Sequence, residues 1–462
     1  MERKSKRMML VLLLLLFMFA TTFQECFSDS SQPPIKRRST QSTAARRFGS
    51  TAVFPLTGNV YPLGYYSVSL KIGNPPKIYE LDIDTGSDLT WVQCDAPCKG
   101  CTKPRASLYN PSNNVILCKD PLCSAVHLPA NVQCETPNDQ CDYEVEYADH
   151  GSSLGVLVTD HFPLRLTNGS LLGPRLAFGC GYDQSNPGPN PPPPTAGVLG
   201  LGNGKASIMS QLNGLGLTRN VLGHCLSGRG GGFLFLGDDL VPSSGMVWTP
   251  MSHNSLEKHY SSGPAELLHG GKATGVKGLQ VIFDSGSSYT YFNFQAYKTT
   301  LDMLKKDLKG EPLKDTRDDR TLPICWKGPK PVKTISDVKD YFKPLQLSFS
   351  KAKNVQLELS PEAYLIVTKQ GNVCLGILNG TEVGLGDYNI IGDISLQDKM
   401  VIYNNEKQQI GWVSTNCNRL PNVDRDYNDG IWQPYKADFG ILEEHYSTAS
   451  KINKPTGRRS EL

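Results

Sequence analysis

Along most of this chain, apolar and polar residues alternate, which is the pattern of strands that bury one face. Clear examples are residues 66–72, 143–147 and 232–236. Helical spacing is local, because apolar residues recur at intervals of three and four only over residues 294–308. A short helical turn is also expected at residues 360–363, where Pro follows Ser. The pattern therefore predicts an all-β protein with a few short helices.

Two of the predicted strands end in nearly the same motif. Residues 84–87 read Asp-Thr-Gly-Ser, and residues 284–287, which lie 200 positions later, read Asp-Ser-Gly-Ser. Each motif places a carboxylate at a strand end, and its glycine lets the backbone turn at once. Either copy alone would be an ordinary turn sequence. Two copies about half a domain apart indicate a lobe that occurs twice.

A second pair of segments repeats in the same order. Residues 197–200 read Gly-Val-Leu-Gly and residues 390–392 read Ile-Ile-Gly. Their last glycines follow the two Asp residues by 116 and 108 positions. Apolar residues closed by glycine suit a buried strand that passes close under another loop. The matched order and spacing predict two similar lobes that each offer one carboxylate to a shared cleft.

On these motifs the chain resembles the pepsin-like family of aspartic proteases, from about residue 65 to residue 417. Trp91 also fits the family pattern, and the cysteines that follow it are most similar to the plant nucellin-like and nepenthesin-like branch. The resemblance implies an all-β, bilobal double β-barrel with an active-site cleft between the lobes. It also implies an aspartic endopeptidase that cuts proteins at acid pH and needs neither a cofactor nor a metal.

The resemblance places the catalytic pair at Asp84 and Asp284. Two carboxyls a few ångströms apart cannot both ionise cheaply, so they share one proton and titrate as a unit. Such a pair can activate a water molecule with one member and protonate a peptide carbonyl with the other. Four neighbours are expected to brace the two loops or to hydrogen-bond the carboxylates: Thr85, Ser87, Ser285 and Ser287.

By the same resemblance, Tyr147 would cover the substrate from a hairpin flap and Trp91 would support that flap from below. The chain departs from the family at Ala148, where a glycine usually follows the flap tyrosine. Residues 151–155 also match the G-x-S-x-G pattern of serine hydrolases. That motif needs a helix after its turn, and strand-like residues follow here, so we favour the flap.

The first fifty residues differ in composition from the rest. A basic start precedes an uncharged apolar stretch, residues 8–20, which fits a signal peptide and is short for a membrane span of about 20 residues. We expect a signal peptide over residues 1–28 and a linker or short prosegment over 29–60, with an uncleaved signal anchor as the alternative. Nine Lys/Arg and three Asp/Glu among residues 1–50 account for the net charge of +3. No nucleic-acid-binding patch is therefore expected.

The remaining chain is expected to form an N-terminal lobe at residues 61–240, a C-terminal lobe at 241–420 and a polar tail at 421–462. The proline-rich residues 187–194 are expected to form a stiff surface loop. No stretch after the leader is apolar enough to span a membrane, so no stable membrane anchor is expected. We expect a monomer in the secretory pathway, either extracellular in the cell wall or vacuolar, that acts on peptide or protein substrates.

The cysteines predict an oxidising compartment. Of thirteen, Cys26 lies at the edge of the leader, and the other twelve suit six disulfides. The spacing of Cys94, Cys98 and Cys101 also fits a metal site, but no histidine pair lies nearby. The residues alone do not select a pairing. From the resemblance, the expected pairs are Cys94–Cys98, Cys101–Cys180, Cys118–Cys141, Cys123–Cys134, Cys225–Cys417 and Cys325–Cys374.

Asn168 and Asn379 begin Asn-x-Ser/Thr sequences and would be glycosylation acceptors in the secretory pathway. Besides an endopeptidase, one function of another class remains open, namely a binding or inhibitor protein that keeps this fold without turnover. Relatives of that kind typically lack a catalytic residue. Because this chain has both Asp motifs, we favour the enzyme.

Overall fold

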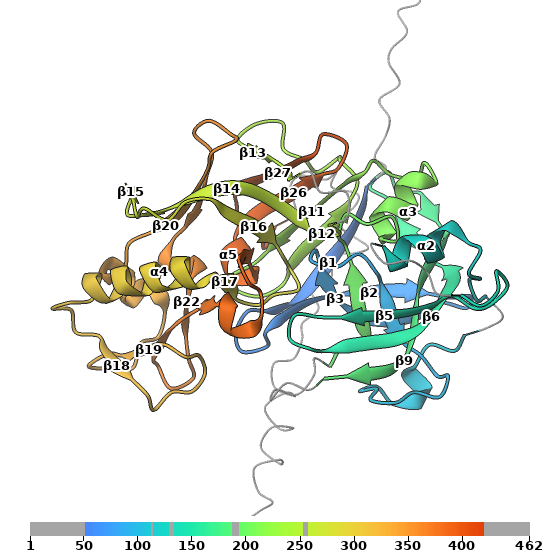
Figure 1. The fold of residues 1–462 in the computed structure, drawn as a ribbon, viewed down its shortest axis with the longest axis horizontal. Coiled ribbons are helices and arrows are strands. Elements are labelled where there is room, and N and C mark those ends of the chain that lie inside the picture. The colour runs from blue at the N-terminus through green and yellow to red at the C-terminus, as the bar shows by residue number, and fades with distance from the viewer. Residues whose placement is uncertain (1–50, 112–113, 129–133, 187–193, 253–256, 420–462) are drawn as a thin grey trace, which may run out of the picture. The chain divides into compact units, whose positions relative to one another are not determined.

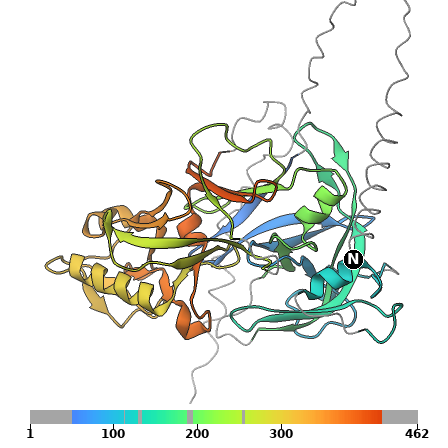
Figure 2. The same ribbon diagram turned by 45° about the horizontal axis from the view of Figure 1, so that its top comes forward.

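The computed structural model describes residues 51–419 except 112–113, 129–133, 187–193 and 253–256. The signal peptide, most of the proline-rich loop and the tail, all predicted from the sequence, lie outside the described residues. Among the described residues, strands greatly outnumber helices, so the prediction of an all-β fold is confirmed (Figures 1 and 2). In the same part of the chain, no helix has the length and apolar content needed to cross a membrane.

Thirteen of the described strands form one long sheet in the order β13-β27-β26-β11-β12-β1-β2-β3-β10-β4-β9-β6-β5. Its strands from the first half of the chain are β1 (Ala52–Asn59), β2 (Tyr65–Ile72), β3 (Lys77–Asp84), β4 (Trp91–Gln93), β5 (Asp142–Glu146), β6 (Ser152–His161), β9 (Arg175–Ser185), β10 (Gly197–Gly200), β11 (Val221–Leu226) and β12 (Gly232–Leu236). Its later strands are β13 (Val247–Pro250), β26 (Lys399–Asn404) and β27 (Gln409–Ser414). Strands from both halves thus share one sheet.

A second sheet, described with eight strands, belongs to the C-terminal half alone. It contains β14 (Tyr260–His269), β15 (Lys272–Ala273), β16 (Leu279–Phe283), β17 (Thr290–Phe292), β20 (Leu345–Phe349), β21 (Gln356–Leu359), β24 (Ile377–Asn379) and β25 (Tyr388–Ile391). Two smaller sheets contain β18 (Lys314–Thr316), β19 (Cys325–Lys327), β22 (Leu365–Val367) and β23 (Val373–Leu375), and β7 (Leu164–Arg165) with β8 (Leu171–Leu172). In Figure 1 the two halves lie on either side of β11, β12 and β26.

The described α-helices are α2 (Pro121–His127), α3 (Ile208–Gly214), α4 (Phe294–Asp307) and α5 (Asp393–Leu396). The helix predicted from the apolar spacing of residues 294–308 is α4. It begins after Asn293, whose side-chain oxygen accepts a hydrogen bond from the Ala296 N–H at 3.0 Å. Its buried face carries Ala296, Thr300 and Leu304, and it packs against the second sheet (Figure 2). A 3₁₀ turn occupies Pro361–Ala363, where a short helical turn was expected.

The linker predicted for residues 29–60 is wrong over its last part, because β1 begins at Ala52. This strand pairs with β12 on one side and with β2 on the other. Its Pro55 lies opposite Phe233, and Leu56 lies between Gly232 and Val68. β2 follows after a short turn, but β12 is distant in sequence, and local composition alone indicated a linker. Residues 52–59 therefore belong to the folded body.

Candidate active site

The same local architecture occurs twice. β10 pairs in parallel with β3, which brings Gly200 beside Asp84, and β25 pairs in parallel with β16, which ends at Phe283 just before Asp284. A Cβ at Gly200 would lie 2.6 Å from the Asp88 carbonyl carbon. A Cβ at Gly392, directly after β25, would lie 2.1 Å from a backbone oxygen. Both repeated glycines are therefore required, because the strands pass directly beneath the Asp loops.

Reciprocal hydrogen bonds join the two Asp loops. The Thr85 N–H donates to Ser285 Oγ at 3.2 Å, and the Ser285 N–H donates to Thr85 Oγ1 at 2.9 Å. Each hydroxyl also donates to the backbone carbonyl of the residue that precedes the Asp of the opposite loop. Thr85 Oγ1 donates to the Phe283 carbonyl at 2.9 Å, and Ser285 Oγ donates to the Ile83 carbonyl at 3.1 Å. The pattern is nearly symmetric, and both side chains are buried. It fixes the two carboxylates relative to each other.

Within each loop, the carboxylate receives two hydrogen bonds. The Gly86 N–H donates to Asp84 Oδ1 at 2.8 Å, and the Gly286 N–H donates to Asp284 Oδ1 at 2.9 Å. The expected serines also donate, Ser87 to Asp84 Oδ2 and Ser287 to Asp284 Oδ2. These bonds orient the carboxylates.

The two carboxylates also face the opposite loops. A Cβ built on Gly86 would lie 2.7 Å from Asp284 Oδ1, and one on Gly286 would lie 2.5 Å from Asp84 Oδ1. Any larger residue at either glycine would collide with the carboxylate across the gap. The structure thus brings Asp84 and Asp284 together in one site.

Burial and a neighbouring charge raise the proton affinity of Asp84. Asp84 is only 7% exposed, and burial followed by the negative charge of Asp284 raises its pKa to about 7. The hydrogen bonds from Ser87 and the Gly86 N–H oppose this rise, because they stabilise the charged form. Over the acid range Asp84 therefore holds its proton more tightly than an ordinary aspartic acid.

A third carboxyl, Asp393, was missed by the sequence analysis. It follows Gly392 at the start of α5 and is 1% exposed, and its Oδ1 has no hydrogen-bond partner among the described residues. Burial, and then the charges of Asp284, Asp82 and Asp84, raise its pKa well above the usual value. The one available signal was an acidic residue directly after the second apolar–glycine segment.

The predicted flap is a hairpin of β5 and β6, with Tyr147 directly after β5. The Tyr147 N–H donates to the Gly151 carbonyl at 2.8 Å, which closes the turn. Trp91 Nε1 donates to Tyr147 Oη at 2.6 Å, so the supporting contact expected of Trp91 is present. Burial and the charge of Asp84 raise the pKa of Tyr147 well above its ordinary value. The flap tyrosine therefore lies on the side of Asp84, the first candidate catalytic carboxylate.

Two of the expected disulfides are present, Cys225–Cys417 and Cys325–Cys374. The other four expected pairs, Cys94–Cys98, Cys101–Cys180, Cys118–Cys141 and Cys123–Cys134, are wrong. The structure contains Cys94–Cys180, Cys98–Cys101, Cys118–Cys134 and Cys123–Cys141 instead.

Sheet register explains the Cys94–Cys180 disulfide, and burial explains the Cys123–Cys141 disulfide. β4 runs parallel to β9 with Val92 beside Cys180, and the Cys94 N–H donates to the Gly181 carbonyl at 3.0 Å. Cys94 and Cys180 are therefore buried neighbours. In the same way, α2 buries Cys123 in an apolar cluster that also contains Cys141.

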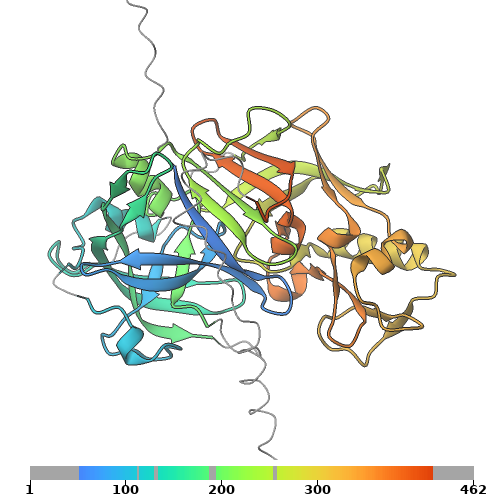
Figure 3. The ribbon, with the colours of Figure 1, turned by 180° about the vertical axis from the view of Figure 1, so that it is seen from behind.

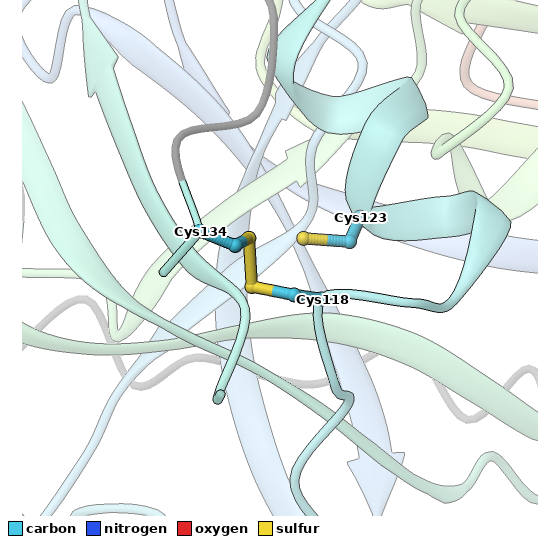
Figure 4. A group of neighbouring side chains, drawn as sticks. All are labelled: Cys118, Cys123 and Cys134. Carbon is cyan, nitrogen blue, oxygen red and sulfur yellow. A yellow bond between two sulfur atoms is a disulfide. The ribbon is translucent and has the colours of Figure 1, made fainter. Parts of the chain in front are cut away.

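Cys118 and Cys134 are left to pair at the surface, and Figure 4 shows their disulfide beside Cys123. Three sulfur-rich groups among the described residues are close enough to hold a metal ion, and Cys118, Cys123 and Cys134 form one of them. Every cysteine in these groups is in a disulfide. Because metal binding requires thiolates, these groups are not metal sites.

The two glycosylation candidates differ in access. Asn168 lies in an exposed turn. Asn379 is 8% exposed, and its Nδ2 donates to Glu382 Oε1 at 2.8 Å. Glycosylation thus stays a prediction, with better access at Asn168.

Comparison with known proteins agrees with this geometry. Residues 66–238 match the family described as xylanase inhibitor N-terminal, and residues 264–414 match xylanase inhibitor C-terminal. An aspartic proteinase of Oryza sativa subsp. japonica is 46% identical over 385 residues, which cover 80% of this chain and 92% of that protein. The chain belongs to the pepsin-like aspartic protease family. The resemblance read from the sequence motifs is confirmed.

Within the pepsin-like aspartic protease family, nepenthesin-2 of Nepenthes gracilis is 26% identical over 374 residues, covering 77% of this chain and 78% of that protein. The crystal structure of basic 7S globulin from soybean matches with a TM-score of 0.62 and 17% identity, covering 81% of this chain and 99% of that one. That structure supports the bilobal pepsin-like fold.

Proposed function

We propose that the protein is an endopeptidase that hydrolyses peptide bonds in proteins at acid pH, with a water molecule activated between Asp84 and Asp284. One observation carries the proposal. Two loops are locked by reciprocal Thr85–Ser285 hydrogen bonds and hold two carboxylates against each other. A fixed pair with one shared proton offers a base and an acid at once.

In the first step, the ionised carboxyl accepts a proton from the bound water as the water oxygen bonds to the peptide carbonyl carbon. The protonated carboxyl donates its proton to the carbonyl oxygen. A neutral tetrahedral diol results, and the pair has exchanged its proton between members. The serine and glycine donors hold both carboxylates in place during this transfer.

In the second step, the C–N bond breaks. The leaving nitrogen takes a proton from the carboxyl that received one from water, and a diol hydroxyl returns its proton to the other carboxylate. The pair is thereby restored, and the products are a new carboxyl and a new amine. Neither step needs a covalent link to the enzyme or a metal.

Tyr147 would close over the bound peptide, and its hydrogen bond to Trp91 would hold the ring in position. An extended peptide can add its backbone groups to a flap hairpin and to the cleft. The substrate would thus be a segment of several residues in an unfolded or flexible protein.

The six disulfides support an oxidising compartment, so we propose a secreted or vacuolar protein. We further propose that it acts as a monomer without a stable membrane anchor. The leader would be removed from the mature protein. Lobes at about residues 61–240 and 241–420 would flank the cleft, and β1 would belong to the folded body as well.

A second candidate is an inhibitor or binding protein without turnover. The descriptions of the two matching families, which name a xylanase inhibitor, favour it. The retained carboxylate pair favours the protease instead.

Digestion of denatured globin between about pH 3 and 6, where a coupled pair retains one proton, separates the two candidates. We expect peptides from the wild type, none from Asp84→Asn or Asp284→Asn, and inhibition by a pepstatin-type compound. Asp302→Asn, on the exposed face of α4, is the matched control and should retain full activity. A folded wild type that releases no peptides would favour the binding protein.

A further inference from the structure

A cavity of about 690 Å³ lies between the end of β1 and the small sheet that contains β22. Its walls include Val60 and Tyr61 after β1, Ile366 of β22 and Lys399 at the start of β26. The catalytic candidates do not line it. Seen from behind, the blue strand β1 ends beside orange segments of the C-terminal half (Figure 3). Cavities of this size commonly hold small molecules.

Lys399 is the unusual residue in this wall. It is 8% exposed, and its Nζ donates one long hydrogen bond, of 3.5 Å, to the Gln397 carbonyl. Lys399 takes part in none of the ion pairs found among the described residues. Lysine is almost never buried without a partner, because an ammonium group loses its hydration there. The site therefore holds a buried cation that lacks an anion.

Burial dominates the electrostatics of this lysine. It lowers the pKa of Lys399 to about 8, although the negative charges of Asp398 and Glu358 act in the opposite direction. Lys399 is still protonated at neutral and acid pH. An anion that entered the cavity would therefore meet a full positive charge in a site of low dielectric.

The other charged groups of the wall are exposed. Arg229, Asp398 and Glu362 line the cavity, and all three are exposed to solvent. Arg229 takes part in none of the ion pairs found among the described residues. It also lines an adjoining cavity of about 300 Å³. Solvent screens the two exposed carboxylates, so their repulsion of an incoming anion is weak. Arg229 can attract the anion at the mouth, and Lys399 can pair with it inside.

We propose that this cavity is a binding site for a small organic anion that carries a carboxylate. The carboxylate would pair with the Lys399 ammonium and supply the missing acceptor, while Arg229 would contact a second acidic group at the mouth. The hydroxyls of Ser360 and Ser414, which also line the cavity, offer further donors. This site is independent of peptide hydrolysis.

Calorimetric titration of citrate into the full-length protein at about pH 6, where Lys399 is protonated and citrate carries at least two negative charges, tests the site. We expect saturable binding that weakens at least ~10-fold in Lys399→Met and ~3-fold in Arg229→Gln, as befits lost charge-assisted contacts. Lys305→Met, on the exposed face of α4, is the matched control and should bind like the wild type.

Two results would overturn the proposal: no saturable binding by the wild type, or equal binding by Lys399→Met. If Lys399→Met does not fold, the wild type is titrated again at about pH 9.5, where Lys399 is neutral. Affinity should then fall at least ~10-fold, and unchanged affinity would contradict the proposal. None of these readouts depends on proteolysis.

Discussion

Replacing Asp84 with Asn should remove one contribution to the pH dependence of stability, that of a single buried carboxyl. In the folded protein the pKa of Asp84 rises from 3.8 to about 7, mainly through burial. The native state therefore binds this proton more tightly than the unfolded state. For such a group, stability is greatest below the unfolded pKa and falls as pH rises through the folded pKa. A shift of roughly 3 pKa units corresponds to about 4 kcal/mol lost between about pH 4 and pH 7.

Asn cannot ionise, so Asp84→Asn should be more stable than the wild type at neutral pH by up to about 4 kcal/mol and similar at pH 4. Urea unfolding at both pH values, with the disulfides kept oxidised, measures the difference. Asp302→Asn, an exposed carboxyl on α4, is the control and should lose stability with pH as the wild type does. If Asp84→Asn loses as much stability as the wild type between the two pH values, the buried-carboxyl reasoning is wrong.

Two further predictions concern contacts near Asp84 and Asp284, and a third concerns a disulfide. Trp91→Phe removes the hydrogen bond to Tyr147 and should lower kcat/KM by ~10-fold without unfolding the protein, as peptide kinetics would show. Thr85→Val leaves a buried N–H of the opposite loop without its acceptor and should cost about 1–3 kcal/mol in urea unfolding. Mass spectrometry of a non-reduced digest should find Cys94 linked to Cys180.

Each of these predictions has a clear contrary outcome. Wild-type kinetics in Trp91→Phe would show that the flap tyrosine is held by other contacts. Wild-type stability in Thr85→Val would show that the loops do not depend on their reciprocal hydrogen bonds. A peptide that links Cys94 to Cys98 would contradict the burial argument for the disulfides and restore the pairing implied by resemblance.

Local features were predicted from the sequence where the signal was itself local. The two Asp loops, their hydroxyl neighbours and the apolar–glycine segments each occupy a few consecutive residues. The apolar spacing that predicts a helix covers residues 294–308, and α4 covers Phe294–Asp307. In these elements backbone turn chemistry and helical periodicity determine the local structure, and both are visible in a few consecutive residues of the sequence.

Features that depend on distant partners were missed. β1 pairs with β12, which begins at Gly232, as well as with the neighbouring β2, and its own Pro-containing sequence did not reveal it. The disulfides follow the parallel register of β4 and β9 and the buried face of α2, which no cysteine spacing encodes. The role of Asp393 arises because folding buries it near carboxylates more than 100 residues away.

Hydrolysis of one synthetic peptide in water labelled with heavy oxygen, at about pH 4, tests the paired-carboxylate chemistry most directly. The wild type should cut the peptide and place one labelled oxygen in the new carboxyl group. Asp84→Asn and Asp284→Asn should each lose at least ~1000-fold in kcat while still folding, because either substitution removes the shared-proton pair. Appreciable cleavage by either variant, or a folded wild type that leaves the peptide intact, would contradict the proposed role of the two aspartates.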